Sequence, residues 1–370
     1  MIPRLVLLAA VLFSGISARP TPTFGYGSSL DLQILRDASI ALAHRAPAAI
    51  LPRLHRNPAV GEAAIGLDGR TVSVRFRDGL QSAILPAGAA GSSSIQSRAP
   101  GPRRFRELQT GARAVVLEPF AAELGEGGAA GQTEAAILQS AGFTVDRVLD
   151  TAVTVGTMAT LSQYAVVYMD THSGVNQYGE GVVSTGEVFG TDQSLDPLVK
   201  EGSLMSVSVA GSSQLYYGVL SQYIRLHGAS FPAGALVVLN GCGMLRASLF
   251  WQALQQRGVQ TLVSWDDEVL SDDAYAASSV LFNALASGAT VDGGVQAVIA
   301  AGHGFSTPSG QGTAKFGYLG NGSLTLRALI PVTPTPVLEA PGPLCHRMPK
   351  TQISEFGLVA VRKQRRSCIS

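Results

Sequence analysis

The chain has few charged side chains for its length. Charged residues make up 14% of the 370 residues, whereas soluble domains usually contain about 25%. The formal net charge is only +1, so neither nucleic acid nor an anionic membrane surface is indicated as a partner. Apolar residues reach 46%, which is enough to bury a large core and argues against disorder over most of the chain.

Cysteine is also scarce. The three cysteines, Cys242, Cys345 and Cys368, are too few for a disulfide scaffold. Cys345 and Cys368 lie close to the C-terminus and could pair in an oxidising compartment. Cys242 would then be the one free thiol of the chain.

The longest apolar run of the chain lies at the N-terminus. Arg4 precedes the apolar residues 5–13, and small residues follow, which is the pattern of a secretory signal peptide over residues 1–18. The alternatives are an uncleaved anchor and a buried first strand. No other stretch reaches about 18 uninterrupted apolar residues. We therefore expect an exported protein (secreted, periplasmic or at the cell surface) with no integral membrane segment after signal removal.

Several ligand-binding and catalytic motifs are absent. The sequence has no Gly-x-Ser-x-Gly, no phosphate loop of the Gly-x-x-x-x-Gly-Lys-Ser/Thr type and no cysteine or histidine pair with zinc spacing. Gly241 and Gly243 are followed by Arg246 where a dinucleotide-binding motif needs glycine. We therefore predict no metal and no cofactor.

Composition divides the chain into segments. Residues 19–86 form an N-terminal region with a predicted β-hairpin. Residues 87–111 are rich in Gly, Ala, Ser, Pro and Arg, which is typical of a linker whose arginines are either solvated or a processing site. Residues 112–330 are the predicted main domain, and residues 331–370 are a Pro-rich and basic tail.

Strand and helix patterns alternate within the main domain. This order predicts an α/β domain with a parallel sheet and crossover helices. A hairpin over residues 178–189, turned at residues 184–186, is expected as an insertion. Residues 215–227 have apolar side chains at helical spacing, so a helix is predicted there.

Two apolar stretches of the main domain end in reactive side chains. Residues 164–172 form a strand pattern that ends in His172, and residues 235–243 form another around Cys242. Unbroken apolar runs of this length are typical of strands buried on both faces of a parallel sheet. Because ligands bind at the carboxyl ends of such strands, we expect both side chains at one functional edge.

Histidine and cysteine at one edge suggest thiol chemistry. An imidazole can deprotonate a thiol, and the thiolate can attack an acyl carbon. The N–H groups of Gly174 and Cys242 are candidates for the oxyanion hole. The alternative is structural, since a buried cysteine is commonly a small apolar residue and a histidine at a strand end can belong to the core.

The two blocks, Val-Val-Tyr-Met-Asp-Thr-His-Ser-Gly at 166–174 and Leu-Val-Val-Leu-Asn-Gly-Cys-Gly at 236–243, resemble the caspase/hemoglobinase-type (clan CD) cysteine peptidases, which include caspase-like and gingipain-like domains. The resemblance implies a three-layer α/β/α sandwich with a mostly parallel sheet, to which this chain adds a small β-containing N-terminal region. It also implies that His172 and Cys242 are a catalytic dyad. Ser173 stands where the family usually has glycine, so the oxyanion donor is either Gly174 or Ser173.

The resemblance extends to the strand that follows the Cys242 block. In related peptidases the residues after this strand line the pocket for the substrate's P1 side chain, so Trp265 becomes a candidate wall. Asp266 or Asp267 is a candidate partner for Arg or Lys at P1 through a charge-assisted hydrogen bond. Alternatively, these acids cap the next helix or face water.

These patterns predict an exported cysteine endopeptidase. It would hydrolyse a polypeptide substrate through a thioester acyl-enzyme, with a basic P1 preference as a further hypothesis. The alternative is a non-catalytic caspase-like module that serves as a binding scaffold. A working dyad requires a reactive, partly exposed thiol at Cys242, whereas a scaffold allows that thiol to be buried and inert.

Overall fold

The computed structural model describes residues 28–87, 112–124, 129–308 and 313–330. The predicted signal peptide (1–18), nearly all of the predicted linker (87–111) and the tail (331–370) lie outside the described residues. The tail contains Cys345 and Cys368, so their predicted pairing stays a prediction.

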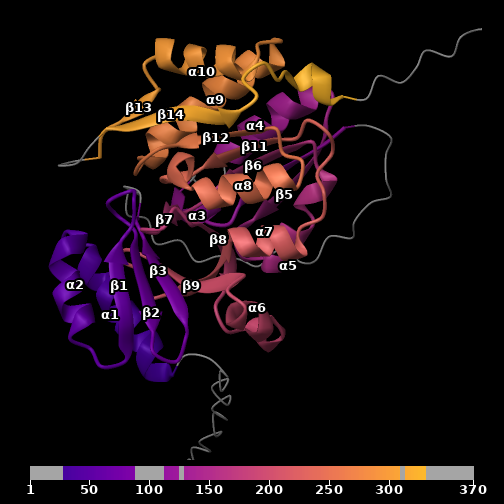
Figure 1. The fold of residues 1–370 in the computed structure, drawn as a ribbon. Coiled ribbons are helices and arrows are strands. Elements are labelled where there is room, and N and C mark those ends of the chain that lie inside the picture. Colours follow the sequence, from indigo (N-terminus) through magenta and orange to yellow (C-terminus); the bar gives the residue numbers. More distant parts are fainter. Residues whose placement is uncertain (1–27, 88–111, 125–128, 309–312, 331–370) are drawn as a thin grey trace, which may run out of the picture. The chain divides into compact units, whose positions relative to one another are not determined.

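The chain is an α/β protein with two mixed seven-stranded sheets (Figure 1). The first sheet is mainly parallel and has the order β13-β14-β12-β11-β6-β4-β5. Its five parallel strands are β4 (Arg113–Glu118), β5 (Thr144–Leu149), β6 (Val166–Asp170), β11 (Leu236–Asn240) and β12 (Thr261–Trp265). The antiparallel strands β14 (Ala314–Gly320) and β13 (Phe305–Ser306) complete it.

Helices pack against both faces of the parallel-rich sheet because its central strands are apolar on both faces. On β6, Val166 and Tyr168 belong to one apolar cluster, and Val167 and Met169 belong to another. The first cluster includes side chains from α4 (Ala129–Ser140), α9 (Ser271–Ala286) and α10 (Val291–Ala300). The second includes side chains from α5 (Val155–Ala159), α7 (Ser221–His227) and α8 (Ser248–Gln256).

The second sheet is curled like half a barrel and has the order β1-β2-β3-β9-β10-β8-β7. All its pairs are antiparallel except β3 with β9. The strands are β1 (Val60–Ile65), β2 (Val72–Phe76), β3 (Gln81–Leu85), β7 (Ser173–Val175), β8 (Gly181–Val188), β9 (Leu204–Val209) and β10 (Leu215–Leu220).

The N-terminal region contributes the first three strands of this sheet. Its helices are α1 (Ser29–Leu42) and α2 (Pro47–His55), and the predicted hairpin is present as β2 and β3. Ser82 to Leu85 pair in parallel with Ser206 to Val209. This ladder joins the N-terminal region to the segment that follows residues 88–111.

The predicted hairpin within residues 178–189 is misplaced. Strand β8 runs without interruption through residues 184–186, and the chain instead reverses between β7 and β8, where Asn176 N–H donates to the Glu180 carbonyl (2.9 Å). Gly186 is not part of a turn. It allows the backbone at Asp150 to pack closely against β8, since a Cβ at position 186 would lie 2.0 Å from the Asp150 carbonyl oxygen.

The predicted helix over residues 215–227 is only half correct. Its first part is strand β10 and its second part is helix α7. Leu215, Tyr217 and Val219 are all fully or nearly fully buried, which is the two-residue period of a strand face. The same apolar side chains also satisfy a helical spacing, so periodicity alone selected the wrong structure. Within the part of the chain that the structure describes, no helix is long and apolar enough to cross a bilayer.

Candidate active site

The ends of β6 and β11 bring the two candidate catalytic residues to one edge of the parallel-rich sheet. The strands are neighbours, and Asp170 is in register with Asn240. Thr171 N–H donates to the Asn240 carbonyl (3.3 Å), which extends the pairing by one residue. His172 and Cys242 each follow the last paired strand residue by two positions, and the His172 carbonyl accepts from the Ser184 N–H (3.0 Å).

Ser173 and Gly241 fix the backbone between these two ends. The Ser173 hydroxyl, 1% exposed, donates to the Cys242 carbonyl (2.9 Å). A Cβ on Gly241 would lie 2.4 Å from that hydroxyl oxygen and 2.5 Å from the Thr171 carbonyl oxygen. Only glycine fits at position 241 without displacing backbone. The serine that departs from the family pattern therefore has a clear structural contact.

The His172 side chain is buried beside a carboxylate that the sequence did not indicate. His172 is 2% exposed, and its Nε2 lies 3.3 Å from Glu123 Oε1. Glu123 belongs to the short helix α3 (Ala121–Leu124), which follows β4. Phe120 packs edge-on against the imidazole, with ring centroids 4.8 Å apart. The hydrogen bond to His172 lowers the pKa of Glu123, although burial opposes it.

A carboxylate on one ring nitrogen fixes the orientation and the tautomer of a histidine. If Glu123 accepts the Nε2 proton, Nδ1 of His172 is left as the basic nitrogen. The only sequence signal for Glu123 is its place, five residues after the end of a buried parallel strand.

The Cys242 side chain points into the core. It is 4% exposed and belongs to the apolar cluster that contains Trp265 and Val269. Burial raises the pKa of the thiol to about 12; a hydrogen bond from the Val269 backbone opposes this, and the acids Glu268, Asp68 and Asp267 add to it. The thiol is therefore protonated at neutral pH in this conformation. Among the described residues, His172 is hydrogen-bonded to Glu123, and no hydrogen bond joins its ring to the Cys242 thiol.

Gly174, the predicted oxyanion residue, lies in β7 opposite Val182 of β8. A Cβ at this position would lie 2.0 Å from Thr71 Oγ1. A side chain of the N-terminal region therefore occupies the space next to Gly174.

The predicted P1-pocket residues have three different environments. Trp265 is 0% exposed, and its indole N–H donates to Asn240 Oδ1 (3.3 Å), so it lies inside the core in this conformation. Asp266 Oδ1 accepts from the Lys315 N–H (2.7 Å) and thereby holds the start of β14. Asp267 is ion-paired with Arg246 at 3.3 Å.

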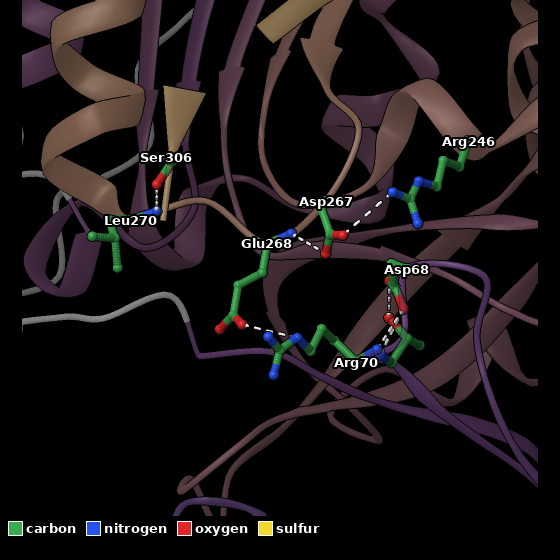
Figure 2. Close-up of polar contacts among 8 residues, drawn as sticks. Asp68, Arg70, Arg246, Asp267, Glu268, Leu270 and Ser306 are labelled. Carbon is green, nitrogen blue, oxygen red and sulfur yellow. Dashed lines mark hydrogen bonds and ion pairs between the residues drawn. The ribbon is translucent and has the colours of Figure 1, made fainter. Parts of the chain in front are cut away.

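Glu268, which the sequence reasoning did not single out, is paired with an arginine from the N-terminal region. Its Oε2 lies 3.3 Å from Arg70 Nε, and the two side chains are only 17% and 14% exposed. Figure 2 shows the pairs Glu268–Arg70 and Asp267–Arg246 next to each other, with Asp68 close to Arg70. Burial raises the pKa of Glu268, and the charge of Arg70 lowers it.

A second group of acids is buried: Glu118 and Asp170 end strands β4 and β6, and Glu134 belongs to helix α4. Burial raises the pKa of Asp170 to about 8 and that of Glu134 to about 7. Burial also raises the pKa of Glu118, which is ion-paired with Arg147 at 2.7 Å. In the described parts of the chain, no three His, Cys, Asp or Glu side chains are placed to hold a metal ion.

Comparison with models of protein families finds no match, and comparison with curated proteins finds no relative of this chain.

Proposed function

We propose that the chain is a cysteine endopeptidase on a caspase-like, three-layer α/β/α domain, with Cys242 as nucleophile and His172 as general base and acid. The observation that carries the proposal is the parallel pairing of β6 with β11, since His172 follows the end of one strand and Cys242 follows the end of the other. The Glu123 carboxylate on the imidazole supports it further, because catalytic histidines are commonly oriented by such a partner.

The reaction would proceed in two steps. The imidazole takes the thiol proton, and the sulfur attacks the carbonyl carbon of the scissile peptide. The C–N bond then breaks, the imidazolium protonates the leaving amine, and a thioester remains on Cys242. A water molecule, deprotonated by His172, attacks the thioester and releases the acid and the thiol. The N–H of Cys242, with that of Gly174 or Ser173, would stabilise both oxyanions.

This chemistry requires the thiol to leave the apolar cluster. A thiol with a pKa of about 12 is almost fully protonated at neutral pH, and only the thiolate is an effective nucleophile. The described conformation is therefore a resting one, and a rearrangement at Cys242 must precede catalysis.

The burial of Cys242 also favours a second candidate, a non-catalytic caspase-like module that binds a partner. A scaffold needs no exposed thiol, and a 4% exposed cysteine in an apolar cluster satisfies it without rearrangement. Both candidates keep the proposal of export, which rests on residues 1–18 alone.

The test is covalent labelling of the full chain by a peptidyl acyloxymethyl ketone with Arg at P1. The peptidase predicts labelling that is lost in Cys242→Ala and slowed by at least about 100-fold in His172→Ala. Glu123→Gln should slow labelling less than His172→Ala, since Glu123 acts through the imidazole. Labelling that persists in Cys242→Ala would refute the dyad.

A further inference from the structure

The turn between β1 and β2, residues 66–71, extends from the N-terminal region to the sheet edge that carries Cys242. Two contacts at Leu67 fasten it there. The Leu67 N–H donates to the Asn176 carbonyl (3.4 Å), and Arg246 Nη1 donates to the Leu67 carbonyl (2.8 Å). The turn is therefore hydrogen-bonded to the segments that follow both candidate catalytic residues.

Asp68 shapes this turn and ties it to β7. The side chain is 3% exposed. Its Oδ1 accepts from the N–H groups of Arg70 (2.9 Å) and Thr71 (2.8 Å), and its Oδ2 accepts from the Thr71 hydroxyl (2.6 Å). Oδ2 also accepts from the Val175 N–H (3.0 Å). The turn is thus rigid, and one of its four bonds is made to the strand that follows His172.

The same turn covers the glycines that follow the two candidate catalytic residues. A Cβ on Gly243 would lie 3.2 Å from Asp68 Cβ, and a Cβ on Gly174 would lie 2.0 Å from Thr71 Oγ1. Gly174 is a candidate oxyanion donor and Gly243 directly follows the candidate nucleophile, so a peptide bound at Cys242 would have to approach both. Because Asp68 and Thr71 already fill the space next to these glycines, no peptide can enter along this route while the turn is seated.

Arg70, in the same turn, places a positive charge next to the acids that follow β12. Asp68, Asp267 and Glu268 all raise the pKa of Cys242, in addition to the larger effect of burial, so these three carboxylates lie close enough to act on the thiol. Arg246 pairs with Asp267, whereas Arg70 pairs with Glu268 (3.3 Å). With side chains 14% and 17% exposed, the Arg70–Glu268 pair is only partly open to water. A guanidinium bound to a partly buried carboxylate close to the candidate nucleophile is the contact that a basic substrate side chain would make.

We infer that residues 67–71 are an internal occupant of the substrate path, with Arg70 in the place of a substrate's basic side chain and Glu268 as the carboxylate that selects it. This inference rests on the proposed peptidase function and makes the described conformation a latent one. It assigns the basic preference to Glu268 and not to Asp266 or Asp267. Displacement of the turn frees Gly174, Gly243 and Glu268 together.

The first experiment measures access to the thiol and needs no peptidase activity. The full chain is treated with iodoacetamide, and alkylation of the peptide that carries Cys242 is followed by mass spectrometry. Arg70→Gln and Glu268→Gln, which remove the same ion pair from opposite sides, should each be alkylated about tenfold faster than the wild type, the factor expected for losing one charge-assisted bond. Arg75→Gln makes the same charge change at an exposed position of β2 and should leave the rate unchanged. Wild-type rates in both pair variants would overturn the inference.

The second experiment uses acyloxymethyl ketones with Arg or norleucine at P1 on the same proteins. Arg70→Gln should be labelled about tenfold faster by the Arg probe than the wild type. Adding Glu268→Gln to it should reduce the preference for Arg over norleucine about tenfold; an unchanged preference would overturn the role of Glu268. Fast alkylation of Arg70→Gln without labelling of any variant would refute the peptidase but keep the turn as a cover. Labelling of the wild type as fast as Arg70→Gln, with unchanged alkylation, would refute the cover but keep the peptidase.

Discussion

Two groups of acids belong to the parallel-rich sheet and the segments packed against it, and the protein stabilises them in opposite ways. The paired acids, Asp267 and Glu268, are each bound to an arginine. Of the buried acids, Glu118, Glu134 and Asp170, only Glu118 is ion-paired in the described part of the chain, with Arg147. Negative charge is therefore balanced by guanidinium groups in the paired acids and largely by protons in the buried acids.

This difference has a physical cause in water access. The side chains of Glu268 and Asp267 are 17% and 20% exposed, so an ion pair there keeps some hydration. Glu134 is 0% exposed, and its Oε2 has no hydrogen-bond partner among the described residues. Within the same part of the chain, Asp170 receives only a 3.5 Å bond from Asn240. An isolated charge in such surroundings is costly, and a buried carboxyl becomes neutral instead.

The largest expected effect comes from the one arginine among the buried acids. Arg147→Gln leaves the Glu118 carboxylate, which is 1% exposed, without its cation. Removing one partner of a buried pair costs about 3 kcal/mol or more, so the free energy of unfolding in urea should fall by about that amount. Arg113→Gln is the matched control. Arg113 of β4 is ion-paired with Asp146, the residue before Arg147 on β5, and Asp146 is 42% exposed. Equal losses in the two variants would contradict the distinction between the groups.

The buried acids also predict an unusual dependence of stability on pH. Burial raises the pKa of Asp170 from 3.8 to about 8. The folded protein therefore keeps a proton that the unfolded chain has already lost above pH 4. The stabilisation is complete below that pH and is lost as the pH rises through about 8. Glu134, with a pKa of about 7, adds a loss in the same direction.

Asp170→Asn isolates this contribution, since an amide of the same shape does not titrate. Between pH 6 and pH 9, the wild type should lose more unfolding free energy than the variant, by an amount of at least about 1 kcal/mol. Urea unfolding at both pH values measures it. Parallel stability curves for the two proteins would show that Asp170 is ionised in the folded state throughout.

The fold around these acids was predictable where the signal is local. Strands buried on both faces leave unbroken apolar runs, so β6, β11 and β12 could be located. The parallel pairing of β6 with β11 was also expected from this pattern. Strand β10 could not be identified, because its side chains fit a helical period as well as a strand period. Pairing with β8 and β9 makes this segment a strand. The sequence of residues 215–220 alone does not indicate these partners.

The acids of the candidate site were harder to predict for the same reason. Glu123 and Glu268 lie outside the periodic elements or in a single short turn of helix, where spacing carries little information. Glu123 is identified by its contact with His172, 49 positions away. Glu268 is identified by its contact with Arg70 in the N-terminal region. The sequence did indicate an acidic segment after β12, but it gave no means to prefer Glu268 over Asp266 or Asp267.

The smallest expected effect lies among the paired acids. Arg246→Gln removes the partner of Asp267 but leaves that carboxylate 20% exposed and still bonded to the Glu268 N–H (2.7 Å). Because Arg246 itself is 40% exposed, the loss in unfolding free energy should be at most about 1 kcal/mol. Salt should reduce it further, since screening acts on exposed pairs more than on buried ones. Urea unfolding at low and high ionic strength, with Arg147→Gln alongside, tests both statements. A loss for Arg246→Gln as large as that for Arg147→Gln, and insensitive to salt, would mean that the two groups of acids are equally desolvated and that hydration does not separate them.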